Sequence, residues 1–220
     1  MPMPFDLPQR PKLGISACLL GAPVRYNAGH KESRLCSHSL AHYVPDLPLA
    51  EAGRLNDPEL RENLLTRVYA YAQWQELCRE GLSHKAIIDF HSRYKYQLMA
   101  NDPVQYKALG RLLGNVGAHA PQEIGPRYFS TLMAALKKCA TRGSHSNVLQ
   151  HLCGYLKRHL DRDEKAEIQR LIEQYRSGMV PLVVPLTLLK HHFNSHPDSY
   201  ITQQAYLQPH PEELSLRNVL

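Results

Sequence analysis

Cationic and aromatic side chains alternate in one short string of the chain, FHSRYKYQLMA. His91 and Lys95 are four residues apart and therefore share one face of a helix, with Arg93 and Tyr96 beside them. RNA phosphates attract positive charge and unstacked bases pack on flat rings, so this pattern is typical of a surface that contacts RNA. It fits equally well a core tyrosine at Tyr94 with solvated charges around it, and both interpretations stay open.

A second basic group, Lys157 and Arg158, follows Tyr155 in the sequence. We interpret these two residues as phosphate contacts that extend the same surface, rather than as catalysts. Residues 84–160 carry eleven Lys or Arg against three Asp or Glu, a net charge of +8, which leaves −2 for the rest of a chain whose total is +6. The charge predicts an anionic partner, nucleic acid first, although a solvated basic surface explains it as well.

The N-terminal segment contains a glycine-bearing loop with four side chains that could bind an anion: Arg25, Tyr26, His30 and Lys31. Glycine permits close approach of a ligand to the backbone, and Arg and Lys supply hydrogen-bond donors. The loop therefore contacts a substrate or phosphate in one interpretation and is a mobile arm in the other.

Three histidines, His191, His192 and His196, have a spacing that could suggest a metal site. His192 and His196 would lie one helical turn apart, but Pro197 marks a helix boundary and no carboxylate is suitably placed, so we expect no metal there. The sequence also has no P-loop, GxGxxG or GxSxG string. Kinase, nicotinamide-dependent and common hydrolase mechanisms therefore have no support.

The five cysteines are odd in number, widely spaced and without a CxxC pair: Cys18, Cys36, Cys78, Cys139 and Cys153. This argues against a disulfide framework and against a zinc ribbon. We expect most of them to be buried thiols, because free cysteine is among the most buried residue types.

The helices that would position these side chains begin near residue 57, where apolar residues start to recur at helical spacing. Asp57, Ser83 and Asp102 are N-cap signals, Gly143 and Ser144 suggest a break between helices, and a left-handed glycine is expected at Gly178. The predicted helices cover residues 57–78, 83–98, 102–113, 121–140, 148–156 and 161–175, with one or two more in 181–206. The predicted fold is therefore all-α, a bundle of six to seven helices beside an irregular N-terminal segment with one short strand at residues 12–17.

Composition places the chain among globular proteins, with 43% hydrophobic and 21% charged residues in a length of 220. The longest apolar stretch, residues 179–189, is interrupted by Pro181 and Pro185, so we expect no membrane span. The first residues lack the basic and apolar regions of a signal peptide, and we therefore expect a cytoplasmic protein.

Long strings of the sequence resemble two known domains. The string GISACLLGAPVRYNAGHK at residues 14–31 resembles the start of the TudS-like domain of thiouracil and tRNA thiouridine desulfidases. The strings FHSRYKYQLMA, HLCGYLK, PLVVPLTLLKHH and YLQPHPEELSLRN resemble the YbgA-like helical domain, a domain of unknown function. The resemblance implies a remnant of the desulfidase domain at residues 1–52 and a YbgA-like domain at 53–220.

Proteins that join both domains are tRNA thiouridine desulfidases in which three cysteines hold a 4Fe-4S cluster. Cys18 matches the first of these ligands, but the PVCPE-like and SPSCG-like strings that carry the other two are absent, and Cys36 matches neither. We therefore expect no cofactor and a protein that binds RNA, most readily tRNA, without its own cluster chemistry. The alternatives are an active iron-sulfur desulfidase with a non-standard ligand set and a module that binds a partner protein.

Overall fold

The computed structural model describes residues 57–210 and 217, and this part of the chain is all-α, as the sequence predicts. Within it lie α2 (Pro58–Glu80), α3 (His84–Asn101), α4 (Pro103–Gly114), a 3-10 turn η4 (Val116–Ala118), α5 (Pro121–Leu136), α6 (Arg142–Leu156), α7 (Arg162–Arg176), α8 (Val183–Ser195) and α9 (Ser199–Thr202). The segment 181–206, for which one or two helices are expected, forms two, α8 and the short helix α9. None of the described helices is long and apolar enough to cross a membrane.

Several predictions fall on residues outside the described part of the chain. They are the remnant domain at 1–52, the strand at 12–17, the cysteines Cys18 and Cys36, and the loop with Arg25, Tyr26, His30 and Lys31.

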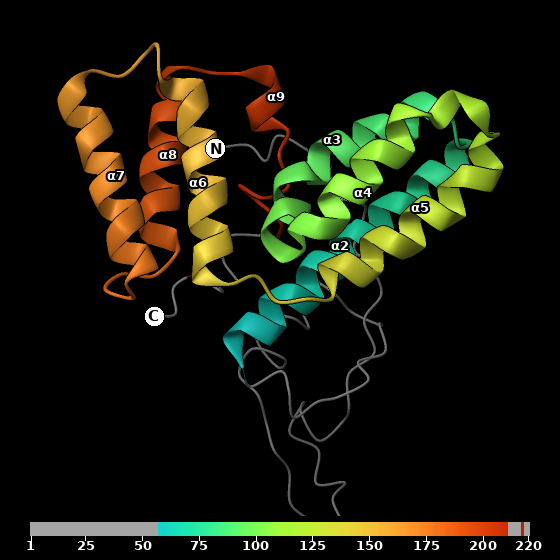
Figure 1. Cartoon of the computed structure of the whole chain (residues 1–220), viewed down its shortest axis with the longest axis horizontal. Coiled ribbons are helices and arrows are strands. Elements are labelled where there is room, and N and C mark those ends of the chain that lie inside the picture. The colour runs from blue at the N-terminus through green and yellow to red at the C-terminus, as the bar shows by residue number, and fades with distance from the viewer. Residues whose placement is uncertain (1–56, 211–216, 218–220) are drawn as a thin grey trace, which may run out of the picture.

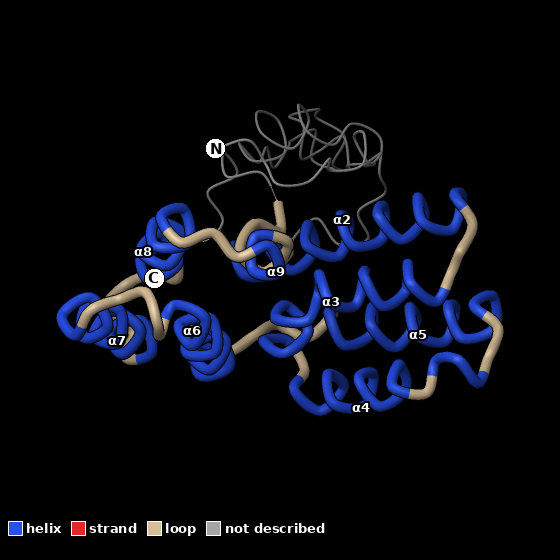
Figure 2. Tube along the Cα trace, turned by 90° about the horizontal axis from the view of Figure 1, so that it is seen from above, coloured by secondary structure: helices blue, strands red, loops and turns tan. Residues whose placement is uncertain are grey.

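The described helices form two groups that lie side by side (Figure 1). One group contains α2, α3, α4 and α5, and the other contains α6, α7 and α8. In Figure 2 the second group is seen nearly end on while the first is seen along its length, so the two groups cross steeply. α3 links them, because it packs against α4 and α5 of the first group and against α6 of the second.

Most helices begin where the sequence predicts, because a polar side chain caps the N-terminus. Asp57 accepts hydrogen bonds from two backbone N–H groups in the first turn of α2, at 2.8 and 3.1 Å. Asp102 caps α4 in the same way, and Asp161 caps α7. These bonds satisfy N–H groups that have no partner within the helix, which explains why such boundaries can be read locally.

The start of α6 corrects the sequence analysis. Gly143 and Ser144 do not separate two helices, since both lie inside α6. The backbone N–H of Ser144 donates to Oγ1 of Thr141 at 3.1 Å, and the backbone N–H of Thr141 donates to Oγ of Ser144 at 2.9 Å. This reciprocal capping box starts the helix ahead of the glycine.

The end of α5 also differs from the prediction, because the helix stops at Leu136 rather than near Ala140. Nδ2 of Asn63 in α2 donates to the carbonyl oxygens of Leu136 and Lys138, at 2.7 and 3.1 Å. Nδ2 of Asn101 in α3 donates to the same two carbonyls. The last carbonyls of a helix have no partner within it, and here two other helices supply the donors.

The hydrophobic core consists of two clusters that both include residues of α3. One cluster lies within the first group of helices, where the Trp74 ring stacks on Phe129 with centroids 4.7 Å apart. Tyr94 belongs to this cluster, is 2% exposed and donates from its hydroxyl to Oε1 of Gln73 at 2.9 Å. Tyr94 is therefore a core residue.

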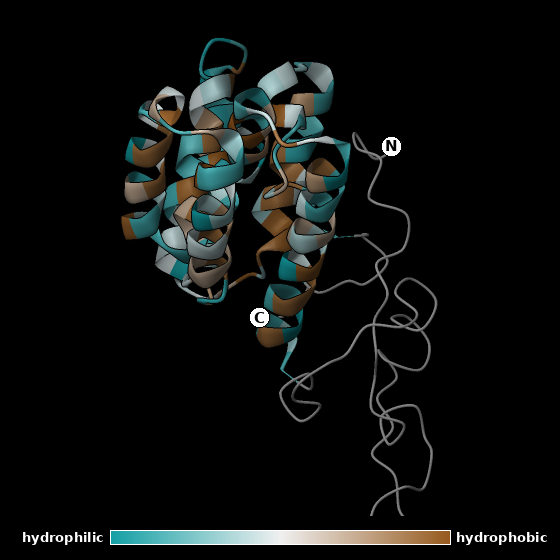
Figure 3. Ribbon diagram, turned by 90° about the vertical axis from the view of Figure 1, so that its right-hand side faces the viewer, coloured by the Kyte–Doolittle hydropathy of each residue, from teal (hydrophilic) through white to brown (hydrophobic). Residues whose placement is uncertain are grey.

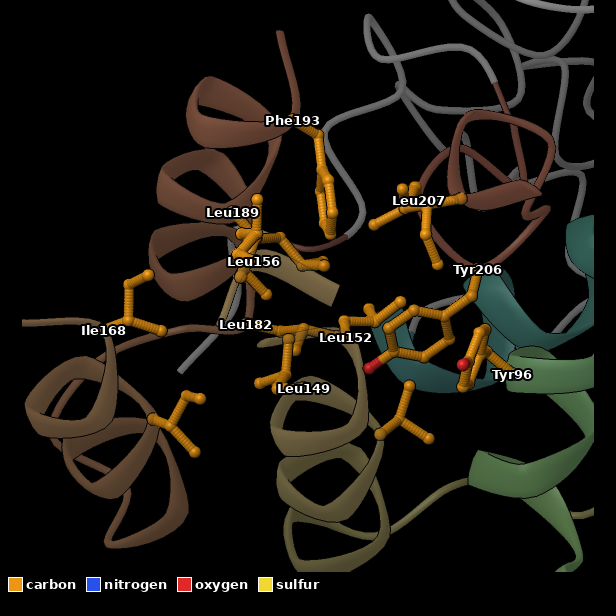
Figure 4. Close-up of a cluster of buried hydrophobic side chains, with 14 of the residues drawn as sticks. Tyr96, Leu149, Leu152, Leu156, Ile168, Leu182, Leu189, Phe193, Tyr206 and Leu207 are labelled. Carbon is orange, nitrogen blue, oxygen red and sulfur yellow. The ribbon is translucent and has the colours of Figure 1, made fainter. Parts of the chain in front are cut away.

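The second cluster joins α6, α7 and α8 to the last turns of α3. Figure 4 shows Leu149 and Leu152 of α6 directed toward Leu182, with Tyr96 and Tyr206 at one side of the cluster. Hydrophobic and hydrophilic stretches alternate around the helices in Figure 3, as expected for helices that each bury one face.

Candidate nucleic-acid interface

An aromatic and cationic surface lies where the two groups of helices meet. The rings of Tyr155 in α6 and Tyr200 in α9 are stacked, with centroids 6.1 Å apart and planes at 25°. Nζ of Lys95 in α3 lies 5.6 Å from the centroid of the Tyr200 ring. We call these three residues the tyrosine surface; the elements that carry it lie along the upper edge of Figure 1. Tyr155 is 38% exposed, so a flat ligand can reach its ring.

A surface hollow of about 640 Å³ adjoins the tyrosine surface. His91, Lys95 and Tyr200 line it on one side, and α4 contributes Lys107 and Arg111 on the other. Lys107 and Arg111 are exposed and one helical turn apart, so both can contact the same bound group. The hollow therefore places three cations of two helices around one space.

Tyr96 supports the tyrosine surface from beneath it. Its side chain is 2% exposed, and its hydroxyl donates to the hydroxyl of Tyr155 at 3.2 Å. Burial, together with the hydrogen bond to Tyr155, raises the pKa of Tyr96 well above its ordinary value. The Tyr96 hydroxyl therefore stays protonated and holds Tyr155, and the exposed ring available to a base is that of Tyr155.

His91 lies in the hollow but adds no charge to it at neutral pH. Its Nδ1 is 3.2 Å from the hydroxyl of Tyr128, which is buried. Burial of the ring lowers the pKa of His91 to about 4, and the nearby Lys95 contributes in the same direction. The neutral ring can still exchange a hydrogen bond with a ligand.

The structure does not bring Arg93 to the other predicted residues. Arg93 lines a different hollow, together with Glu76, Glu80 and Asp89, whereas Lys95 faces the tyrosine surface. Burial lowers the pKa of Arg93. Two residues of separation in a helix place side chains on different faces, which explains the divergence.

Lys157 and Arg158 lie just beyond the end of α6, close in sequence to Tyr155, and both are exposed. Cations are favourable at this end of a helix, where the dipole is negative. The next residue, His159, stacks on His196 with ring centroids 4.8 Å apart. Arg158 is three residues from Tyr155 and can share its helix face, whereas Lys157, two residues from Tyr155, lies on another side of the helix end.

Three other cations of the basic stretch have partners within the protein. Lys138 forms an ion pair with the buried Asp102, and Nη1 of Arg142 donates to the carbonyl oxygen of Tyr175 at 2.9 Å. Lys85 lies 3.7 Å from Asp89 in α3. Fewer Lys and Arg side chains of residues 84–160 are therefore available to a binding partner than the sequence suggests.

The histidine string does not assemble into a ligand set. His192 is buried, and the ring of His196 is stacked on that of His159. Among residues 57–210 and 217, no group of three or more His, Cys, Asp or Glu side chains is placed to hold a metal ion.

The expectation of buried thiols is wrong for two of the described cysteines. Cys78 and Cys139 are exposed, and Cys153 is partly buried. Cys78 lies near the end of α2, and Cys139 lies in the connection between α5 and α6, where neither faces a core cluster. Burial raises the pKa of the Cys153 thiol to about 12.

Sequence reasoning missed Lys107, Arg111 and Tyr200 as members of the site. The spacing of Lys107 and Arg111 on a predicted helix could have revealed a cationic face. Tyr200 carries no local signal, because it reaches Lys95 only through the packing of α9 on the other helices.

Comparisons with known proteins agree with the helical part of the chain. Residues 95–211 match the family described as "Protein of unknown function (DUF1722)". The chain is 30% identical over 167 residues to the uncharacterized protein YbgA of Escherichia coli (strain K12), and the match covers 74% of this chain and 98% of that protein. No solved structure matches the chain. On these matches, the chain belongs to the DUF1722 family.

Proposed function

We propose that the protein binds RNA, with tRNA as the foremost candidate, through the tyrosine surface and the cations around it. The observation that carries this proposal is the stacked, partly exposed pair of Tyr155 and Tyr200 with the ammonium group of Lys95 over the Tyr200 ring. An unstacked base can pack on the Tyr155 ring while its phosphates contact neighbouring cations. The surface therefore offers a ring for the base of a nucleotide and cations for its phosphate.

The charges around the rings fit a single strand or loop better than a protein partner. Lys107 and Arg111 line the hollow beside the tyrosine surface, and Arg158 follows Tyr155 by three residues at the end of α6. A chain of phosphates can engage both groups at once, and each neutralised phosphate releases counterions. Binding should therefore weaken steeply as the salt concentration rises.

The choice of tRNA among RNAs rests on the resemblance of residues 14–31 to tRNA thiouridine desulfidases. A tRNA partner would place the protein in the cytoplasm. The chemistry of a desulfidase is not part of this proposal, because the strings that carry two of the three cluster cysteines are absent from the sequence.

The test is fluorescence anisotropy of labelled tRNA against the full chain over a range of salt concentrations. We expect Lys95→Ala to weaken binding and to reduce the slope of log K against log salt by about 1, as for the loss of one phosphate contact. Lys85→Ala is the matched control, because Lys85 lies on the same helix, pairs with Asp89 and lines the other hollow.

The proposal fails if the unsubstituted protein shows no binding at low salt. It also fails if Lys85→Ala and Lys95→Ala reduce binding equally, since that would indicate a response to net charge alone. A partner protein captured in place of RNA, and retained after nuclease treatment, would favour the protein-binding alternative.

A further inference from the structure

A polar cavity of about 80 Å³ lies apart from the tyrosine surface, where α2, α3, α6 and α7 meet Arg217. This cavity is lined mainly by polar and charged side chains, which is unusual for a space between packed helices. The lining residues used below are Glu62, Thr66, Gln97, Arg142, His145 and Arg217.

Arg217 is held in the wall of the cavity by three contacts. Its Nε donates to Oε1 of Glu62 at 2.5 Å, and its Nη1 donates to the carbonyl oxygen of Tyr206 at 2.6 Å. The guanidinium also lies 5.2 Å from the centroid of the Tyr206 ring. Its remaining nitrogen, Nη2, is buried without a hydrogen-bond partner in the described part of the chain. The other contacts fix the position of this free donor.

Two more buried polar atoms in the cavity wall have no partner among the described residues. They are Oγ1 of Thr66 and Oε1 of Gln97, whose side chains are 3% and 5% exposed. Nε2 of Gln97 donates to Oδ1 of Asn101 at 2.8 Å, which fixes the amide orientation and leaves its oxygen as a free acceptor. Buried polar atoms without partners are costly, so a donor, an acceptor and a hydroxyl in one cavity indicate a bound polar group.

The charges in the cavity wall balance. Burial alone would raise the pKa of Glu62, but Arg217 and His210 outweigh it and hold the pKa well below its ordinary value, so the side chain is a carboxylate. Burial, with Arg217, lowers the pKa of His145 to about 4, so this ring is neutral at pH 7. The cations Arg142 and Arg217 therefore face the anions Glu59 and Glu62. A ligand with a net charge would disturb this balance, and a neutral one would not.

We propose that this cavity binds a small neutral molecule that presents a carbonyl next to an N–H, the class of amides and cyclic ureides. The ligand carbonyl accepts from Nη2 of Arg217, its N–H donates to Oε1 of Gln97, and the Thr66 hydroxyl bonds to whichever group lies nearer. None of the residues of this site belongs to the tyrosine surface or its adjoining hollow. The proposal therefore does not rest on RNA binding.

The probe for this site is 2-imidazolidinone, a five-membered cyclic urea, titrated into the full chain labelled with nitrogen-15. We expect saturable shifts of the Gln97 side-chain amide signals, with a dissociation constant near the millimolar range expected for so small a ligand. Cyclopentanone has the same ring size and the carbonyl but no N–H, and we expect it to bind about tenfold more weakly or not at all. Acetate, which carries a charge, should cause no saturable shift.

Thr66→Val removes one hydroxyl with little change in shape and should weaken binding of 2-imidazolidinone several-fold. The matched control is Thr187→Val, because Thr187 is exposed on α8 and bonds only to its own helix. The proposal is overturned if 2-imidazolidinone causes no saturable shift at about 50 mM, well above a millimolar dissociation constant. It is also overturned if cyclopentanone binds as well, or if both threonine variants behave alike.

Discussion

Tyr96 and Tyr155 have different tasks, although their hydroxyl groups are bonded to each other. Tyr96 is buried and bonds to its neighbour, whereas Tyr155 is partly exposed. A fixed aromatic ring loses little conformational freedom when a base stacks on it, which favours binding. The pairing of a buried and an exposed tyrosine therefore suits a stacking platform.

We predict that Tyr155→Ala weakens binding of single-stranded or loop RNA by about 1–3 kcal/mol, the typical value for loss of one stacked base. The matched control is Tyr71→Ala, since Tyr71 is 50% exposed but lies on α2 next to Phe129. Anisotropy titrations of both variants provide the comparison. An equal effect of the two substitutions would contradict a stacking role for Tyr155.

The residues of the site could be predicted only in part. Spacing placed His91 and Lys95 on one helix face, and the structure confirms this. Spacing does not reveal which of Tyr94, Tyr96 and Tyr155 is exposed, because burial depends on the neighbouring helices. The polar cavity was not predicted at all, since its walls come from segments far apart in the sequence.

The ends of α7 and α5 show why some helix boundaries can be predicted from the sequence and others cannot. The end of α7 is local: the backbone N–H of Met179 donates to the carbonyl of Gln174 at 2.8 Å, and that of Gly178 to Tyr175 at 3.0 Å. Gly178 has φ of 86°, which glycine adopts most readily. The end of α5 depends on side chains of α2 and α3, and a local pattern contains no sign of them.

We predict that Gly178→Ala lowers the free energy of unfolding by roughly 1–2 kcal/mol, because a side chain strains the left-handed conformation. Gly110→Ala should act in the opposite direction by up to about 1 kcal/mol, because Gly110 lies within α4 and its added methyl group meets no atom within 4 Å. Urea unfolding followed by circular dichroism measures both changes. A change of the same sign in the free energy of unfolding of both variants would contradict the role given to the left-handed conformation of Gly178.

The end of α5 depends on the side chain of Asn63 in α2. Asn63→Ala removes the donor to the carbonyls of Leu136 and Lys138 and should cost roughly 1–2 kcal/mol of stability. Asn147→Ala is the control, because Asn147 is exposed on α6. Equal unfolding midpoints for the two variants would show that Asn63 does not secure the helix end.

Two partly buried histidines connect the stability of the whole molecule to pH. The pKa of His91 and that of His145 are both lowered to about 4, in each case chiefly by burial. Between pH 6.5 and 4 the unfolded chain therefore binds protons at these rings while the folded chain does not. The free energy of unfolding must fall as the pH is lowered through this range.

We predict a loss of roughly 1–2 kcal/mol per histidine between pH 7 and pH 5. His145→Gln should make the stability less dependent on pH in this interval, and His151→Gln, at an exposed position of α6, serves as the control. Urea midpoints at the two pH values measure the effect. A His145→Gln protein as sensitive to pH as the unsubstituted chain would contradict it.

The ion pair of Glu62 and Arg217 joins residues 155 positions apart and has a consequence for synthesis on the ribosome. Chains emerge from the N-terminal side, so α2 is complete long before its cationic partner has been translated. A nascent chain released before residue 217 would carry this unmatched charge, which makes it a ready target for cellular quality control.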